Sequence, residues 1–258
     1  MLRYLALAFA LILLQSFQTG AAAQPVEDRR FCDDAAANVL LLLDVTTPYD
    51  TADRSTLISG IEQIFDSLGN GDRISIRTIE DAFSNSHRLL DMCVPYCPSN
   101  GFLRDLFSNC TMGVVINEKK RLRAAITLTL RNRLEAAGEL PTSEIIRTIA
   151  AASKEEFRSG RPNRIYIFSD MIENSVYLSG RAFFSTGIGP LMTQLEGDGL
   201  IPHLQGANVQ VFGFGRTGVA DRPPLAQEML KRLSAFWTAY FRAAGAALSL
   251  QQHLSSAE

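Results

Sequence analysis

The stretch Asn38–Asp44, which reads NVLLLLD, decides the fold. Its unbroken apolar run points side chains to both faces of an extended chain, so both faces must be covered by other parts of the protein. Such a run is typical of a central parallel strand between two helical layers. Ile165–Phe168 and Val209–Phe214 repeat the pattern. The sequence therefore predicts three buried strands.

The segments between these runs have helical or alternating patterns. Arg73–Ile79 alternates and is expected to pair as a hairpin with a strand over 87–93. Asp53 is the expected N-cap of the first helix. Helical spacing predicts helices over 53–68, 118–137, 143–158, part of 187–206, and 225–244. The alternation predicts an α/β fold, a three-layer doubly wound and mostly parallel central sheet with one antiparallel edge strand.

The first 23 residues have the pattern of a secretory signal peptide. Arg3 precedes an apolar run over 5–14, and Ala21-Ala22-Ala23 supplies small residues for cleavage after Ala23. An uncleaved anchor is the alternative, but the run is shorter than a membrane-spanning helix requires. We therefore expect a signal peptide over 1–23, a single domain over 24–258, a periplasmic or secreted location, and no stable membrane insertion after cleavage.

The four cysteines fit an oxidising compartment. An even count in an exported chain predicts two disulfides, and three pairings are possible. We favour Cys97 with Cys110 and Cys32 with Cys93, because the hairpin brings the end of its second strand close to the start of the first buried strand. Zinc is the alternative, since the spacing of Cys93 and Cys97 is tolerable, but no second ligand pair follows.

Two acids end predicted strands at what should be the same edge of the sheet. Asp44 ends the first buried strand, and Asp170 follows the second. The functional crevice of an open α/β sheet lies at the carboxyl ends of its strands. Thr46 follows Asp44, and Ser143 opens a helix that should face the same edge. Carboxylates and hydroxyls at one rim suit Mg²⁺ or a similar divalent cation, although Ser143 and Asp53 are equally explained as helix caps.

At these residues the chain resembles the von Willebrand factor A family. The resemblance rests on Asp44-Val45-Thr46-Thr47-Pro48, on the helix start at Ser143, on the strand ending Phe168-Ser169-Asp170-Met171, and on the glycine turn after Val209–Phe214. It implies a metal-ion-dependent adhesion site with Asp44, Thr46, Ser143 and Asp170 as ligands. Pro48 departs from the pattern because it offers no side-chain oxygen, and Met171 stands where the family has glycine.

The resemblance implies an exported protein-binding module for adhesion or assembly, and not an enzyme. Its partner would be another protein, bound at the rim through a divalent cation. The loop between Cys93 and Cys110 is a second candidate contact surface. The net charge of −2 and the lack of a basic run predict no nucleic-acid partner. The alternatives are a metal-dependent phosphoester hydrolase using Asp44 and Asp170, and a structural domain with a non-functional metal site.

Other signals are weaker. Gly213-x-Gly215-x-x-Gly218 matches a dinucleotide fingerprint, but no strand is expected after the last helix, so no βαβ unit should close around it. Asp44-x-Thr46 is similar to the motif of haloacid dehalogenase-type phosphatases, with threonine replacing the second acid. The aromatic stripe of the last helix is expected to be core, with a partner surface as the alternative. It comprises Phe236, Trp237, Tyr240 and Phe241.

Overall fold

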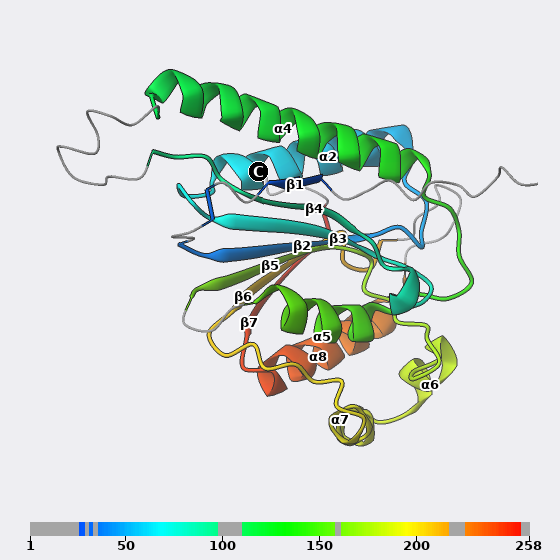
Figure 1. Ribbon diagram of the computed structural model, residues 1–258. Coiled ribbons are helices and arrows are strands. Elements are labelled where there is room, and N and C mark those ends of the chain that lie inside the picture. Colours follow the sequence, from blue (N-terminus) through cyan, green and yellow to red (C-terminus); the bar gives the residue numbers. More distant parts are fainter. Residues whose placement is uncertain are drawn as a thin grey trace, which may run out of the picture.

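The computed structural model has a seven-stranded sheet between two helical layers, with α2 and α4 on one face and α5, α7 and α8 on the other (Figure 1). It describes residues 26–28, 31–32, 36–97, 110–157, 161–216 and 225–253. The strands are β1 (Val26–Asp28), β2 (Asn38–Asp44), β3 (Arg73–Ile79), β4 (Arg88–Cys93), β5 (Asn163–Phe168), β6 (Asn208–Phe212) and β7 (Ala247–Gln251). The helices are α2 (Thr51–Asp66), α4 (Met112–Glu135), α5 (Ile145–Glu156), α6 (Gly180–Ser185), α7 (Ile188–Gly197), α8 (Gln227–Ala243) and the 3₁₀ turn η1 (Phe83–Asn85).

The predicted fold class is confirmed. The strand order is β1-β4-β3-β2-β5-β6-β7, and β2, β3, β5, β6 and β7 run parallel. The expected hairpin forms, because β4 pairs antiparallel with β3. The antiparallel strand β4 is next to the edge rather than at it, since the short strand β1 pairs parallel with its outer side.

The strand β2 is fully buried, as its sequence requires. Leu40 and Leu42 face the core under α5 and α8, whereas Leu41 and Leu43 face the core under α2 and α4. The aromatic stripe of α8 belongs to the first of these cores, so the core interpretation is confirmed. Several of its ring pairs pack edge to face, as Trp237 does against Tyr240 at 5.3 Å between centroids.

Several elements differ from the prediction, among them α4 and β7. α4 begins at Met112, several residues before the predicted start, because the Thr111 hydroxyl accepts the Val114 N–H and caps the helix. The second difference is β7, which was expected to be absent. It pairs parallel with β6 over five residues, so β6, α8 and β7 form a βαβ unit after all. α8 nevertheless begins at Gln227, beyond the glycines of 213–218, and 217–224 lies outside the described residues.

The two disulfides are the pairs favoured from the sequence. Cys32 joins Cys93, and Cys97 joins Cys110. Two disulfides are typical of an exported protein. The predicted signal peptide, over 1–23, lies outside the described residues. Within the part of the chain that is described, no helix combines the length and apolar character needed to cross a bilayer.

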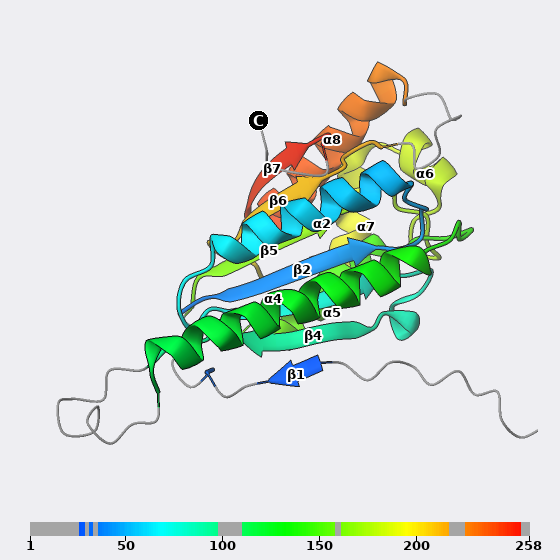
Figure 2. The same cartoon turned by 90° about the horizontal axis from the view of Figure 1, so that it is seen from above.

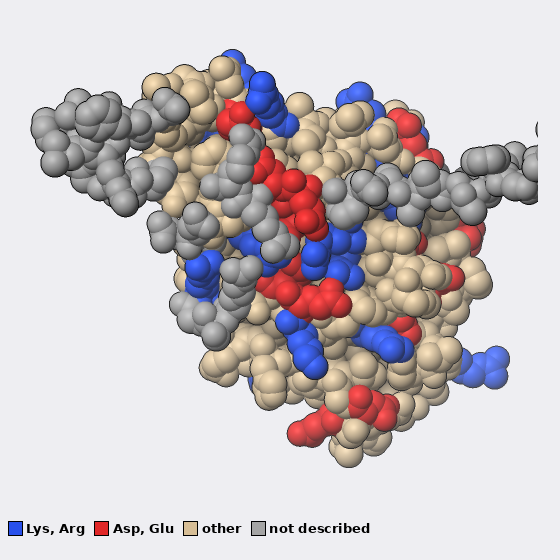
Figure 3. All heavy atoms as spheres, in the orientation of Figure 1, with Lys and Arg blue, Asp and Glu red and all other residues tan. Residues whose placement is uncertain are grey.

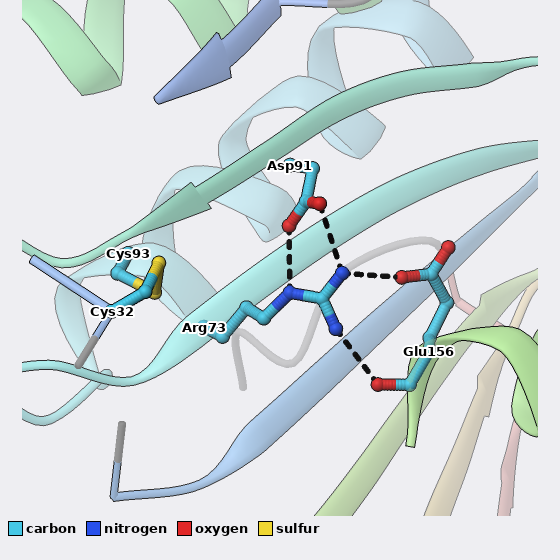
Figure 4. The surroundings of a disulfide bond; sticks show 5 residues. All are labelled: Cys32, Arg73, Asp91, Cys93 and Glu156. Carbon is cyan, nitrogen blue, oxygen red and sulfur yellow. Dashed lines mark hydrogen bonds and ion pairs between the residues drawn. A yellow bond between two sulfur atoms is a disulfide. The ribbon is translucent and has the colours of Figure 1, made fainter. Parts of the chain in front are cut away.

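Charged side chains gather at the β1–β4 edge of the sheet, where Figure 3 shows acidic and basic groups interleaved. Arg73 is almost completely buried beside the Cys32–Cys93 disulfide (Figure 4). Its guanidinium makes two hydrogen bonds to Asp91, at 2.7 and 2.9 Å, and reaches both the carboxylate and the backbone carbonyl of Glu156 at 2.8 Å. This cluster ties β3 and β4 to the end of α5.

Candidate functional site

The carboxyl ends of β2 and β5 bring Asp44 and Asp170 to one rim, as the sequence predicts. The two strands are adjacent and parallel, so their ends meet at the same edge. The Ser169 hydroxyl, next to Asp170, donates to Asp44 Oδ2 at 2.6 Å. In return, the Thr47 hydroxyl beside β2 lies 3.5 Å from Asp170 Oδ2. Each acid is thus contacted by a hydroxyl from the loop that carries the other acid.

The Asp44 carboxylate is held by its own loop. Oδ1 accepts the Thr46 hydroxyl at 2.6 Å and the Thr46 backbone N–H at 3.0 Å. Asp44 and Thr46 are both buried. The hydroxyl of Tyr49 donates to the backbone carbonyl of Asp44 at 2.8 Å. The predicted ligands Asp44 and Thr46 are therefore fixed in one rigid turn.

Burial sets the electrostatics of the two acids. Desolvation raises the pKa of Asp44, although hydrogen bonds from Ser169 and Thr46 oppose the shift. Desolvation, followed by repulsion from Asp44, raises the pKa of Asp170 to about 7. Two close carboxyls resist carrying two negative charges in a dry site. A positive charge placed between them would therefore be stabilised.

Arg216, which the sequence analysis did not single out, is a cation at this rim. Its guanidinium lies 4.2 Å from the centre of the Tyr49 ring and donates to the Pro48 carbonyl at 3.2 Å and to Asp53 at 3.0 Å. It lowers the pKa of both Asp44 and Asp170. The expected capping role of Asp53 is wrong. Asp50 caps α2 by accepting the Asp53 N–H at 2.8 Å, which leaves the Asp53 carboxylate to Arg216.

Ser143 lies in a loop that is joined to the loop after β5. Its backbone exchanges two hydrogen bonds with Asn174, at 2.9 and 3.1 Å. The capping interpretation of Ser143 is wrong, because the Glu173 carboxylate accepts the N–H groups of Ile145 and Ile146 at the start of α5. The Ser143 hydroxyl is buried, and within the described residues it has no hydrogen-bond partner.

Met171 takes a backbone conformation that favours glycine, with φ of 64°. Two contacts hold it there. Its N–H donates to the Ser169 hydroxyl at 2.9 Å, and its carbonyl accepts the Trp237 indole N–H at 2.8 Å. The side chain is fully buried in the core. Met171 therefore replaces the glycine of the resembled motif without filling the rim.

Comparisons with known proteins give a distant structural likeness. No family model and no curated protein matches the chain. Among solved structures, the chain is similar to proximal thread matrix protein 1 from the mussel byssus (crystal form 2), with a TM-score of 0.43 and 10% sequence identity. The likeness covers 86% of this chain and 45% of that protein, so the chain spans less than half of its neighbour's length.

The donors at the rim fit a hard divalent cation, which prefers oxygen ligands. The buried Ser143 hydroxyl has a lone pair to offer, and the raised pKa of Asp170 marks a place where positive charge is favourable. In the described residues, no three His, Cys, Asp or Glu side chains gather as a metal centre. A cation at this rim would thus depend on hydroxyls as well as on the two acids.

A hollow of about 280 Å³ lies beside the rim. Val176 projects there with 88% of its surface exposed. The other lining residues are Asp81, Ala82, Ser84, Thr142, Glu144 and Arg147. A larger cavity of about 760 Å³ is lined by residues near the ends of α5, α7 and α8, including Lys154, Glu196 and His203. The paired acids are not among its lining residues, so its greater volume does not mark it as the site.

The second candidate contact surface is described only at its two ends. Residues 98–109, within the Cys97–Cys110 loop, lie outside the described residues. Beyond the loop, α4 begins with Met112, which is 72% exposed, and Ile116, which is 48% exposed. These side chains place apolar surface next to the disulfide.

Glu173 gives a testable pH dependence. Burial raises its pKa from 4.5 to about 8, so between these values the folded protein keeps a proton that the unfolded chain releases. Stability should therefore fall as the pH rises through this window. Glu173→Gln still accepts the two N–H groups but cannot ionise, so we expect a smaller decline, measured by urea unfolding from pH 4 to pH 9. Glu62→Gln on α2 is the control, and equal declines in Glu173→Gln and wild type would contradict the assignment.

Proposed function

We propose that the chain is an exported protein-binding module of the von Willebrand factor A type, which uses the Asp44–Asp170 rim as its contact surface. The observation that carries the proposal is the pairing of two buried carboxyls at one sheet edge, with the Ser143 loop tied beside them. The exposed Val176 and its hollow supply an apolar contact next to this charged centre. Aromatic or apolar contacts inside a polar rim are typical of protein interfaces.

A divalent cation is part of the proposal. Asp44, Thr46, Ser143 and Asp170 are the residues that would hold it. When bound, the cation would supply an open position for an acidic side chain of the partner. The chain's own residues prepare this role, because Thr46 and Ser169 fix the Asp44 carboxylate and Arg216 balances part of the charge.

Phosphoester hydrolysis is the second candidate, since Asp44 stands at the end of the central strand, as a nucleophile would. Thr46 weakens this candidate. It occupies the position two residues later, where a second acid would transfer the proton, and its hydroxyl instead donates to Asp44. Assays of generic phosphoesters with and without Mg²⁺ separate the two functions. Turnover that is lost in Asp44→Ala would favour the hydrolase.

The rim proposal predicts the effect of a charge in the hollow. Val176→Asp should abolish capture of the native partner by tagged mature protein. It replaces the apolar contact with a charge, in a hollow that the acids Asp81 and Glu144 already line. Leu128→Asp, at an exposed position on α4, should leave capture unchanged. Captured proteins are compared by mass spectrometry with and without a chelator. Equal loss in both variants, or in neither, would contradict the rim as the contact surface.

A further inference from the structure

The two edges of the sheet are built differently. Strand β1 covers one edge with only three residues, of which Glu27 and Asp28 are charged. Short, charged edge strands discourage pairing with another chain. Strand β7 forms the other edge and reads Ala-Leu-Ser-Leu-Gln, without charge or proline. It stays in regular register with β6 along its whole length. Strand β7 itself therefore lacks the charges, prolines and bulges that usually protect an edge strand.

The backbone of β7 leaves one set of groups facing outward. The Ala247 N–H donates to Ala207, and the Gln251 carbonyl accepts from Phe214, so the odd-numbered residues bond towards β6. In a parallel ladder, the alternate residues then point their N–H and C=O groups away from the neighbour. Those residues are Leu248 and Leu250. Within the described chain, no strand pairs with this outer side.

The side chains of β7 extend both faces of the sheet to its edge. Leu248 and Leu250 pack on the core under α8 but are only partly buried. Ser249 is exposed on the opposite face, where Figure 2 shows α2 and α4 over the middle of the sheet and no described helix over β7. A hollow of about 220 Å³ on this half of the sheet includes Ser249 in its lining. At this edge, the face under α8 is apolar and only partly buried, and the opposite face is polar and exposed.

We propose that β7 is the interface with a second copy of this chain, paired antiparallel across a two-fold axis at Ser249. The sequence around this axis is nearly palindromic, so Leu248 of each copy faces Leu250 of the other. The N–H and C=O groups that point outward from β7 belong to these leucines. In an antiparallel pair, two such residues that lie opposite each other exchange two hydrogen bonds. The uncharged strands meet without like-charge repulsion, which favours a second copy over a partner selected by charge.

This pairing has a consequence for the rim. A two-fold axis perpendicular to the sheet makes the strands of the two copies antiparallel, so their carboxyl ends point in opposite directions. A dimer would present two rims on opposite sides and could bridge two partners. The inference does not depend on what the rim binds. Two five-residue strands make a small interface, so the dimer should be weak. We expect its dissociation constant to be about micromolar or higher.

Cysteine cross-linking tests the register directly. Two Ser249 residues on the axis would form a non-hydrogen-bonded pair with Cα atoms about 4.5 Å apart, within disulfide range. The native cysteines are all paired, so Ser249→Cys adds one free thiol. With mild oxidant, this variant should form a covalent dimer much faster than Ser55→Cys, an exposed serine on α2. Equal rates would overturn the proposal.

Sedimentation gives an independent measurement. Wild type should show a concentration-dependent increase in mass, and Ser249→Lys should weaken dimerisation at least about fivefold, because it places two ammonium groups opposite each other. Ser55→Lys should behave as wild type. The thermal midpoint of each variant verifies folding. A wild type that stays monomeric up to near-millimolar concentration, or a Ser249→Lys variant that dimerises normally, would show that β7 does not pair with a second copy.

Discussion

Replacing Arg73 with methionine is expected to lower the free energy of unfolding by about 3–5 kcal/mol, the cost typical of removing one partner from a buried ion pair. The guanidinium binds Asp91 through two hydrogen bonds and Glu156 through two more, and all three residues are buried. Methionine fills a similar volume, so the loss comes from the charges that remain. Glu156 keeps Arg88 at 2.6 Å, whereas Asp91 loses its guanidinium partner. Urea unfolding at neutral pH measures the change.

Arg123→Met is the matched control for this prediction. Arg123 pairs with Asp66 at 2.5 Å, but both side chains are about half exposed. Exposed pairs contribute roughly 0–1 kcal/mol, so this variant should remain close to wild type. The double variant Arg73→Met/Asp91→Leu should recover part of the stability, because it also removes the buried carboxylate that has lost its guanidinium. Similar losses in Arg73→Met and Arg123→Met would show that burial is not what makes the Arg73 cluster important.

The sequence predicts the layers of this fold because burial on both faces leaves a pattern that is visible in one dimension. Val39–Leu43 is apolar throughout, as a central strand covered on both faces requires. Strand β7 was missed for the converse reason. As an edge strand it is only partly buried, so it needs few apolar residues. Its five residues, Ala-Leu-Ser-Leu-Gln, therefore cannot be distinguished from a loop by their pattern.

The site was predicted only in part, for a similar reason. Asp44 and Asp170 follow obvious strands, so parallel topology places them together. Arg216 and Glu173 carry no comparable signal. Arg216 reaches the rim from the loop after β6 and finds Asp53 across a separation of 163 residues. Glu173 caps a helix that precedes it in the chain. Such contacts depend on the tertiary arrangement, which a pattern along the chain does not reveal.

Removing the Cys32–Cys93 disulfide is expected to destabilise the fold more than removing Cys97–Cys110. The first bond closes 61 residues of chain and the second 13. Loop-closure entropy then predicts losses of about 4 and about 3 kcal/mol, respectively, in the unfolded-state description of disulfide stabilisation. The structure adds to this difference, because among the described strands β1 pairs with β4 alone, and Cys32 lies close behind β1 in the chain.

Paired alanine variants test this order, since alanine places no new polar group at the buried Cys93. Cys32→Ala/Cys93→Ala and Cys97→Ala/Cys110→Ala are compared by urea unfolding, with wild type in reductant as the reference for losing both bonds. We expect the 32–93 variant to lie closer to reduced wild type, and its β1 amides to exchange hydrogen faster. If the 97–110 variant is the less stable, the short loop must support the start of α4 more strongly than its entropy suggests. In that case the anchoring of β1 would contribute little to the stability of the domain.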